Sequence, residues 1–243
     1  MWREIESLFR GLCAQEGREG LLAAVPLVDV SLLPAQAEYL SRKLMHLAVP
    51  VDGVSALSIG MAYHPAEIEA IPPEWTGRIP SGSEWHEYAR AYDRLNESVN
   101  RVSSALAAQY NGVAELATLD GMACAVTHVS DYFPHCVSHR AVAEAAGLGW
   151  RGRHELIVTP EYGPAVRLAT VFIPQRVESP ARHLGGCDGC SACLDSCPIL
   201  REAGEGTSQD SYREKCRRRI MSLGLGAEVC GICVRSCWGA ITR

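Results

Sequence analysis

Four cysteines fall within eleven residues near the C-terminus, and they constrain this chain more than any other feature. They form the run Cys187-Asp-Gly-Cys190-Ser-Ala-Cys193-Leu-Asp-Ser-Cys197-Pro198. In this C-x2-C-x2-C-x3-C-P spacing, three thiolates bind three corners of one [4Fe–4S] cluster and the fourth binds a second cluster. The proline after Cys197 turns that thiol away from the other three. The run therefore predicts two iron–sulfur clusters.

The rest of the C-terminal region supplies the thiols that a second cluster needs. The pattern is that of bacterial two-cluster ferredoxins, whose crossover rule assigns the fourth cysteine of each run to the other cluster. The first cluster is then assigned Cys187, Cys190, Cys193 and Cys237, and the second Cys197, Cys216, Cys230 and Cys233. We expect residues 181–243 to form a ferredoxin-like module, separate from a main domain over residues 1–180.

Two other uses of cysteine are disfavoured. Zinc sites also contain C-x2-C pairs, but usually as two pairs separated by a loop. The segment Met1–Ile5 lacks the basic leader and apolar core of a secretory signal, so a reducing, cytoplasmic location without disulfides is expected.

No apolar run reaches the roughly 18 residues of a membrane span, so no membrane partner is expected.

The formal charge of −5 is unevenly distributed. Residues 181–243 contain nine Lys and Arg against seven Asp and Glu, and residues 1–180 contain 14 against 21. An acidic main domain is poorly suited to binding a phosphate backbone. The one basic cluster surrounds Cys216 and contains Arg213, Lys215, Arg217, Arg218 and Arg219. We favour a role in stabilising an anionic cluster and raising its potential, over contact with nucleic acid.

Hydrophobic periodicity predicts a mixed, α+β protein. Helices are expected over residues 2–16, 35–47, 84–110 and 138–146, and strands over residues 54–63, 123–129, 156–158 and 166–173. Residues 21–30 contain Pro26, which indicates an edge strand or an irregular segment. Four prolines within residues 64–82 predict a long loop. Cys13, Cys124 and Cys136 are interpreted as small buried apolar residues.

A glycine-rich segment, Gly147-Leu-Gly-Trp-Arg-Gly152, follows the last predicted helix. It matches the letters of the dinucleotide fingerprint G-x-G-x-x-G, but that motif follows a strand and opens a helix, and the order here is reversed. Binding of NAD is therefore disfavoured. The glycines indicate instead that the backbone closely approaches another element or a large flat ligand.

This segment, with Ala146 before it, lies 35 residues ahead of a two-cluster cysteine set. In this arrangement residues 131–243 resemble the epoxyqueuosine reductases, cobalamin-dependent iron–sulfur enzymes of tRNA modification that are related to reductive dehalogenases. The resemblance implies a nitroreductase-like α/β core that binds cobalamin with its lower ligand displaced. It also implies that the ferredoxin module delivers electrons to the cobalt.

The resemblance further implies particular site residues. The corrin site would be lined by Gly147, Leu148, Gly149, Trp150, Gly152 and Arg153, the last in place of the usual lysine. Tyr63, at the end of a buried strand, is a further candidate, although core packing is favoured for it. Asp131, three residues before Pro134, takes the place of the family's proposed proton donor. That role requires burial to raise the pKa of Asp131, and the alternative is an aspartate that caps a turn or helix.

Histidines add one indirect indication. None of the eight lies in the D-x-H-x-x-G pattern of proteins that bind cobalt through histidine, which is consistent with a corrinoid lacking a protein histidine ligand. His128, His135, His139 and His154 lie near the glycine-rich segment, and each is interpreted as a surface or packing residue.

The leading hypothesis is a cobalamin-dependent iron–sulfur reductase, an oxidoreductase of queuosine biosynthesis. Its clusters would be reduced by an external donor of the flavodoxin or ferredoxin type, and its substrate would be tRNA or a smaller molecule. An alternative is an electron-transfer protein, or one that reduces and carries cobalamin, without an organic substrate of its own. A third possibility is a flavin in place of the corrinoid.

Overall fold

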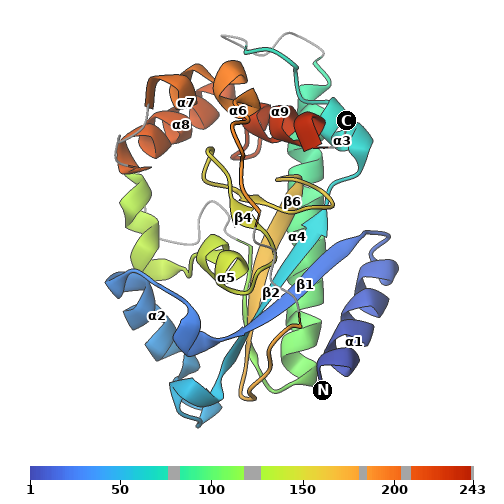
Figure 1. Cartoon of the computed structure of the whole chain (residues 1–243), viewed down its shortest axis with the longest axis vertical. Helices are drawn as coiled ribbons and strands as arrows, with labels where there is room; N and C mark the ends of the chain where they lie inside the picture. The colour runs from blue at the N-terminus through green and yellow to red at the C-terminus, as the bar shows by residue number, and fades with distance from the viewer. Residues whose placement is uncertain (76–82, 118–126, 181–184, 204–208, 242–243) are drawn as a thin grey trace.

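The computed structural model describes residues 1–75, 83–117, 127–180, 185–203 and 209–241. A four-stranded antiparallel sheet lies at its centre, in the order β1 (Gly20–Pro26), β2 (Ser55–Ala62), β6 (Val166–Ile173) and β3 (Val113–Glu115). A short hairpin pairs β4 (Trp150–Arg151) with β5 (Ile157–Val158). The hairpin lies between the sheet and the C-terminal helices (Figure 1).

Helices cover both faces of the sheet and one of its ends. They are α1 (Trp2–Gln15), α2 (Pro34–Leu44), α3 (Pro65–Glu69), α4 (Trp85–Gln109), α5 (His139–Ala145), α6 (Ala192–Ser196), α7 (Pro198–Ala203), α8 (Gln209–Leu223) and α9 (Ile232–Ile241). Four short 3-10 helices are η1 (Leu27–Asp29), η2 (Met45–Leu47), η3 (Val51–Gly53) and η4 (Val129–His135).

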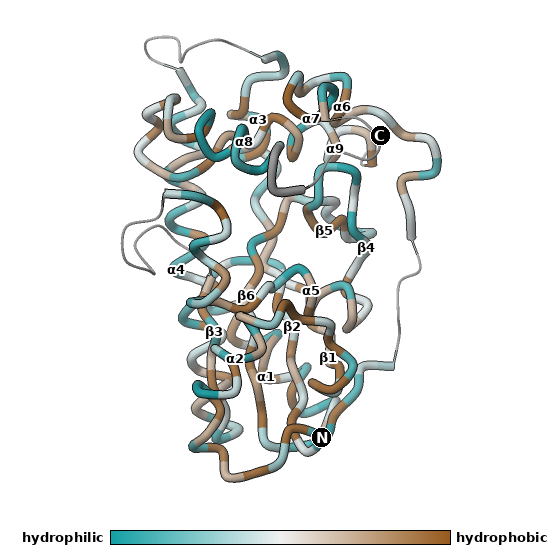
Figure 2. The backbone as a smooth tube through the Cα atoms, turned by 90° about the vertical axis from the view of Figure 1, so that its left-hand side faces the viewer, coloured by the Kyte–Doolittle hydropathy of each residue, from teal (hydrophilic) through white to brown (hydrophobic). Residues whose placement is uncertain are grey.

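Alternation along the central strands explains why two helical layers form. Leu57 and Ile59 of β2 point to one face and pack with α1 and α4, whereas Ala56 points to the other face, with α2 and α5. The same alternation places Val171 of β6 on the α4 face and Phe172 on the α5 face. Because successive side chains of a strand point in opposite directions, a strand buried on both faces reads as a continuous apolar run. Figure 2 shows α4 and α5 on opposite sides of these strands.

The structure confirms the mixed fold and most of the predicted elements. The segment around Pro26 is an edge strand, β1. The predicted long loop opens with a helix that was not predicted, α3, and the strands β3 and β4 were also missed because each spans only two or three residues. The strand predicted over residues 123–129 falls largely outside the described residues. Its described end is wrong, since Val129 opens the 3-10 helix η4.

The C-terminal region shares the main hydrophobic core on the α4 face of the sheet. Val229 and Ile232 are buried in that core. The indole Nε1 of Trp85, the first residue of α4, donates a hydrogen bond to the carbonyl of Cys230 at 2.7 Å. A boundary near residue 180 stays a prediction, and the two parts on either side of it are in direct contact. None of the described helices combines the length and apolar character needed to cross a membrane.

The fold predicts a large cost for truncating Phe172, which is fully buried beneath α5. Changing Phe172 to Ala should lower the free energy of unfolding by about 3–5 kcal/mol, through lost burial and the cavity left behind. Urea denaturation measures the change. Leu116→Ala serves as a control, because Leu116 is 41% exposed and should change stability by less than about 0.5 kcal/mol. Equal effects of the two substitutions would contradict the packing described.

Candidate metal and cofactor site

The eight predicted ligand cysteines lie on the C-terminal helices and on the loops between them. Cys187 and Cys190 precede α6, Cys193 lies in α6, Cys197 caps its C-terminus, Cys216 lies in α8, Cys230 precedes α9, and Cys233 and Cys237 lie in α9. All eight are free thiols in the structure. Asp188 and Gly189 have positive φ angles of 38° and 83°, which close a tight turn from Cys187 to Cys190.

The thiols fall into two groups according to which of them raise one another's pKa. Burial, together with smaller contributions from Cys193, Cys187 and Cys190, raises the pKa of Cys237 to about 12. Burial likewise raises the pKa of Cys233 well above its usual value, with further contributions chiefly from Cys216, Cys230 and Cys197. We call Cys187, Cys190, Cys193 and Cys237 the first thiol group, and Cys197, Cys216, Cys230 and Cys233 the second thiol group. These are the two sets expected from the crossover rule, while their role as ligands stays a prediction.

Two helices explain how the groups interleave. α6 and α9 pack against each other, and each supplies one thiol to each group. On the α6 side these are Cys193 and Cys197, and on α9 they are Cys237 and Cys233. In both pairs the cysteines are four residues apart. On α9 this spacing places the two side chains on one face of the helix, one turn apart, whereas Cys197 lies at the C-cap of α6, where the backbone is extended. The packed helices therefore hold both groups next to each other.

The arrangement differs from a site for a single metal ion. Among the described residues, no three Cys, His, Asp or Glu side chains are close enough to hold one ion together. A structural zinc site requires four ligands around one ion. A [4Fe–4S] cluster spreads its four thiolates over four irons, so its ligands lie farther apart. The donor set, four thiols in each group, fits a [4Fe–4S] cluster.

The basic residues of α8 divide into two kinds. Arg217 and Arg218 form ion pairs with Glu214 at 2.9 and 3.1 Å, and Lys215 lies 3.6 Å from Glu202. The positive charges of Arg213 and Arg219, by contrast, act on Cys216 and lower its pKa against the larger raising effects of burial and of the neighbouring thiols.

Arg219 also stacks on an aromatic ring. Its guanidinium lies 4.1 Å from the centroid of the Trp75 ring. Two cations therefore lie beside the second thiol group, which supports the interpretation that this basic cluster stabilises bound anionic iron–sulfur centres.

The glycine-rich segment is held tightly between α5 and the hairpin. Ser138 caps α5, and Gly147 ends it with a φ of +72°, as predicted. Leu148 is buried against Gly60 of β2, at 3.5 Å from where a Gly60 side chain would begin. A Cβ on Gly149 would lie 2.3 Å from the carbonyl oxygen of Val158. The close approach that this glycine permits is therefore to the hairpin's own second strand.

Two buried N–H groups, one on this segment and one just after it, have no acceptor among the described residues. The indole Nε1 of Trp150 and the Nε2 of His154 are both buried without a hydrogen-bond partner. His154 Nδ1 accepts a hydrogen bond from the Leu156 amide at 3.1 Å, and burial lowers the pKa of His154 to about 4. The ring is therefore neutral at pH 7, with its proton on Nε2. Buried donors without partners are costly, so this place suits a bound group that offers acceptors.

The interpretation of His154 as a surface or packing residue is therefore right about its packing but does not account for its Nε2 proton. It is 5% exposed, as packing requires, and a ring over Gly152 explains that glycine. Nothing in the sequence marks the Nε2 proton, because its lack of a partner depends on the fold of the hairpin. His139 differs, since its ring nitrogens contact the Thr170 hydroxyl at 2.9 Å and the Leu116 carbonyl at 2.8 Å.

Tyr63 and Arg153 differ in their surroundings. Tyr63 is buried against Tyr88, with ring centroids 5.4 Å apart, and burial raises its pKa above the usual value. This confirms core packing for Tyr63. The Arg153 side chain is exposed, whereas Arg151 beside it forms ion pairs with Glu144 and Glu155. Contact of Tyr63 or Arg153 with a cofactor stays a prediction.

Asp131 lacks the environment that its proposed role requires. Its carboxylate accepts hydrogen bonds from the amides of His128 and Thr127, both at 2.8 Å, and from the Thr127 hydroxyl at 3.0 Å. These bonds lower the pKa of Asp131, which is opposite to the raised pKa that a proton donor requires. The alternative, an aspartate that caps a short helix, describes η4. A catalytic role for Asp131 would require the segment to move.

Comparison with known proteins gives matches over parts of the chain. A curated epoxyqueuosine reductase of Listeria monocytogenes is 34% identical over 110 residues, which are 40% of this chain and 28% of that protein. The one of Shewanella oneidensis is 30% identical over 173 residues, which are 65% of this chain and 38% of that protein. The chain is similar to the epoxyqueuosine reductases. This confirms the resemblance predicted from the motifs, although the chain spans less than half the length of these relatives.

The fold agrees with this similarity. The solved structure of the epoxyqueuosine reductase of Streptococcus thermophilus matches with a TM-score of 0.51 at 15% identity, over 96% of this chain and 65% of that one. At this identity the likeness concerns the fold. No family model matches the chain.

The buried, neutral His154 predicts a loss of stability in mild acid. Its pKa is lowered to about 4 from an ordinary 6.5, so the unfolded chain takes up this proton first as the pH falls. The free energy of unfolding therefore has its full value above pH 6.5. It decreases as the pH falls towards 4, by at most about 3 kcal/mol. Denaturant unfolding between pH 7 and 4 measures it. His154→Asn should show a smaller decline than the native chain, and an identical decline would contradict the assignment.

Proposed function

We propose that the chain is a reductase of the epoxyqueuosine reductase type, which uses two [4Fe–4S] clusters and a cobalamin. The observation that carries the proposal is the pair of thiol groups. They are interleaved through α6 and α9, and they adjoin the hairpin that contains the end of the glycine-rich segment. The sequence similarity supplies the reaction class, since the relatives are named for the reduction of epoxyqueuosine.

The thiols would hold the clusters. Cys193, Cys216 and Cys237 have pKa values raised to about 11 or 12, so they are protonated in the iron-free chain at pH 7. Cluster assembly must release these protons, because the thiolate is the ligand. Burial then favours a cluster over bare thiolates, since four thiolates share their charge with iron. Arg213 and Arg219 offset part of the remaining negative charge of the second cluster.

The glycine-rich segment would hold the corrinoid. Cobalamin carries amide side chains whose carbonyl oxygens accept hydrogen bonds, and the buried Nε1 of Trp150 and Nε2 of His154 have no acceptor within the described part of the chain. Bound cobalamin would supply cobalt that, once reduced, is a strong nucleophile and one-electron donor. The chain's own contribution would be to orient the cofactor with these two donors and to exclude water with apolar side chains of the glycine-rich segment, such as Leu148.

The name of the relatives supports the proposed substrate, whereas the proposed electron donor rests on the resemblance inferred from the sequence motifs. We propose an epoxide-bearing nucleoside of tRNA as the substrate, and an external flavodoxin or ferredoxin as the source of electrons. Reduction also consumes protons. Asp131 would supply one only in a conformation that breaks its hydrogen bonds with Thr127 and His128, because those bonds hold it ionised.

Iron analysis tests the two clusters. Anaerobically prepared protein should contain about eight iron atoms per chain, four in each cluster. Cys197→Ala should remove about half of this iron, because it takes one ligand from the second group only. Cys136→Ala is the matched control, since Cys136 is an equally buried thiol outside both groups and should leave iron unchanged. Iron-free native protein, or full iron in Cys197→Ala, would contradict the assignment.

Cofactor binding tests the corrinoid. Added cobalamin should bind the iron-loaded chain and shift its visible absorption bands, and His154→Ala should weaken binding by about tenfold through the loss of one buried hydrogen bond. His46→Ala is the control, because His46 lies in η2, away from the hairpin. Binding of FMN with no response to cobalamin would replace the corrinoid with a flavin. Reduction of bound cobalamin without turnover of epoxyqueuosine-containing tRNA would overturn the enzymatic proposal.

A further inference from the structure

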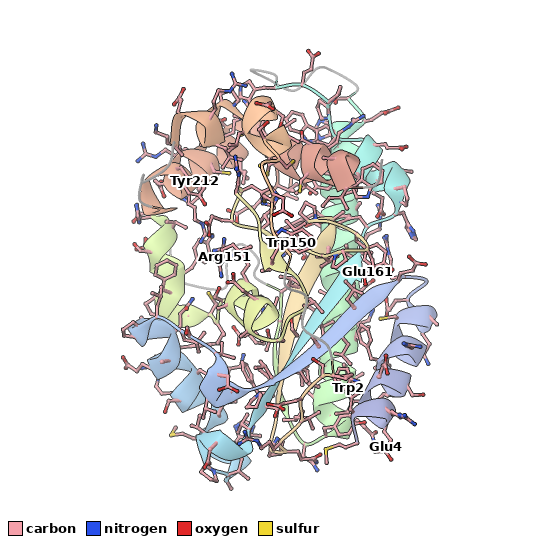
Figure 3. The ribbon with its side chains drawn as sticks, viewed as in Figure 1. Trp2, Glu4, Trp150, Arg151, Glu161 and Tyr212 are labelled. Atoms are coloured by element: carbon pink, nitrogen blue, oxygen red, sulfur yellow. The ribbon has the colours of Figure 1, made fainter. Side chains whose placement is uncertain are left out.

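The side chain of Trp150 touches the segment that leads into the first thiol group. A Cβ built on Gly185 would lie 2.2, 2.5 and 2.7 Å from atoms Cε3, Cζ3 and Cδ2 of the Trp150 ring. The backbone of Gly185 therefore rests directly on the six-membered ring of the indole. Gly185 comes two residues before Cys187. Trp150 lies between α5 and the helices α6 to α9 in the view of Figure 3.

The backbone of Trp150 is held in place by the hairpin and by the residues that precede it. Trp150 is paired with Val158 across the hairpin. The preceding Gly149 fits against the Val158 carbonyl with no room for a side chain, and Leu148 is buried against the sheet. The ring therefore projects from a part of the backbone that has little freedom to shift.

A second contact joins the same region to the other end of the first thiol group. Gly163 follows β5 and pairs with Thr159 in an isolated bridge. A Cβ on Gly163 would lie 3.3 Å from Cδ1 of Ile241 and 3.5 Å from the Cα of Trp238, the residue after Cys237. The two chain ends of the first thiol group thus both contact the hairpin and its extension. The second thiol group contacts α4 instead, through Trp85 and Cys230.

We propose that Trp150 is a positioning residue for the first cluster. The flat ring and the glycine that rests on it fix where the chain enters the first thiol group, and hence the distance from that cluster to the glycine-rich segment. This consequence for electron transfer rests on the proposed function, in which the cluster loses one electron and the corrinoid gains it. The contact itself belongs to the chain alone.

Neighbouring glycines provide a matched test. Gly185→Ala introduces a methyl group that the indole excludes, whereas a Cβ on Gly186 would meet, among the described residues, the flexible Asp188 carboxylate at 3.3 Å. Neither glycine has a positive φ, so the backbone of both accepts alanine. Amide hydrogen exchange of residues 185–190 should be about tenfold faster in Gly185→Ala and within about twofold of native in Gly186→Ala. This comparison needs neither iron nor cobalamin.

Removal of the Trp150 ring provides the second part of the hydrogen-exchange test. In a Trp150→Ala background the obstruction is gone, so Gly185→Ala should add less than about a twofold change in exchange. If Gly185→Ala alone fails to fold, the double variant should still fold. Equal exchange in the Gly185→Ala and Gly186→Ala variants would overturn the proposal, as would effects of Trp150→Ala and Gly185→Ala that simply multiply.

Electron transfer tests the functional consequence. In iron-loaded, cobalamin-bound protein, reduction of the bound corrinoid by prereduced clusters should be about tenfold slower in Gly185→Ala than in Gly186→Ala, with equal iron and equal cobalamin affinity. Stopped-flow absorbance measures the rate. Altered exchange with an unaltered rate would overturn the distance-setting role. A native chain that binds no cobalamin would sink the proposed function and leave the exchange result to decide the Trp150 contact.

Discussion

The packing of α6 against α9 is the interaction on which the rest of the site depends. α9 carries one thiol of each group, and α6 with its C-cap residue Cys197 does the same, so neither group is complete on one segment of chain. Separation of the helices would break both groups together. It also follows that the last helix of the described chain is as important to the first group as the cysteine run where that group begins, because Cys237 closes it.

The same helices are held to the core by contacts of two kinds. On the α4 side, Gly231 fits against Tyr88 and Ile71, and the Arg235 guanidinium donates a hydrogen bond to the Glu69 carbonyl at 2.7 Å. On the hairpin side the contacts are Gly185 with Trp150 and Gly163 with Trp238. Two of these contacts, at Gly231 and Gly185, require a residue without a side chain. Glycine permits backbone to approach an aromatic ring or another backbone closely, and it thereby fixes distance more sharply than flexible side chains would.

Much of this arrangement could be predicted from the sequence, and the remainder has identifiable causes. Cysteine spacing gave the division into two groups, since ligand spacing in the chain reflects cluster geometry directly. Long apolar runs gave β2 and β6. The three-residue strand β3 carries no periodic signal, yet Glu115 in it is fully buried and forms an ion pair with Lys43. A charged residue in a short segment suggests a loop. Only the ion pair with Lys43, which forms in the folded protein, explains why Glu115 can be buried in a strand.

Asp131 shows the limit of inference from position in a motif. Its place before Pro134 agrees with a proton donor, but the function of a carboxylate depends on what donates hydrogen bonds to it. Two amides and a hydroxyl stabilise the charged form, whereas a proton donor at neutral pH needs burial without such donors. His154 illustrates the converse. Its position carries no motif, yet burial and one amide fix its tautomer, and its Nε2 proton has no acceptor in the described regions of the chain. The polar groups that the fold leaves unsatisfied therefore point to a ligand on the hairpin more directly than the aspartate does.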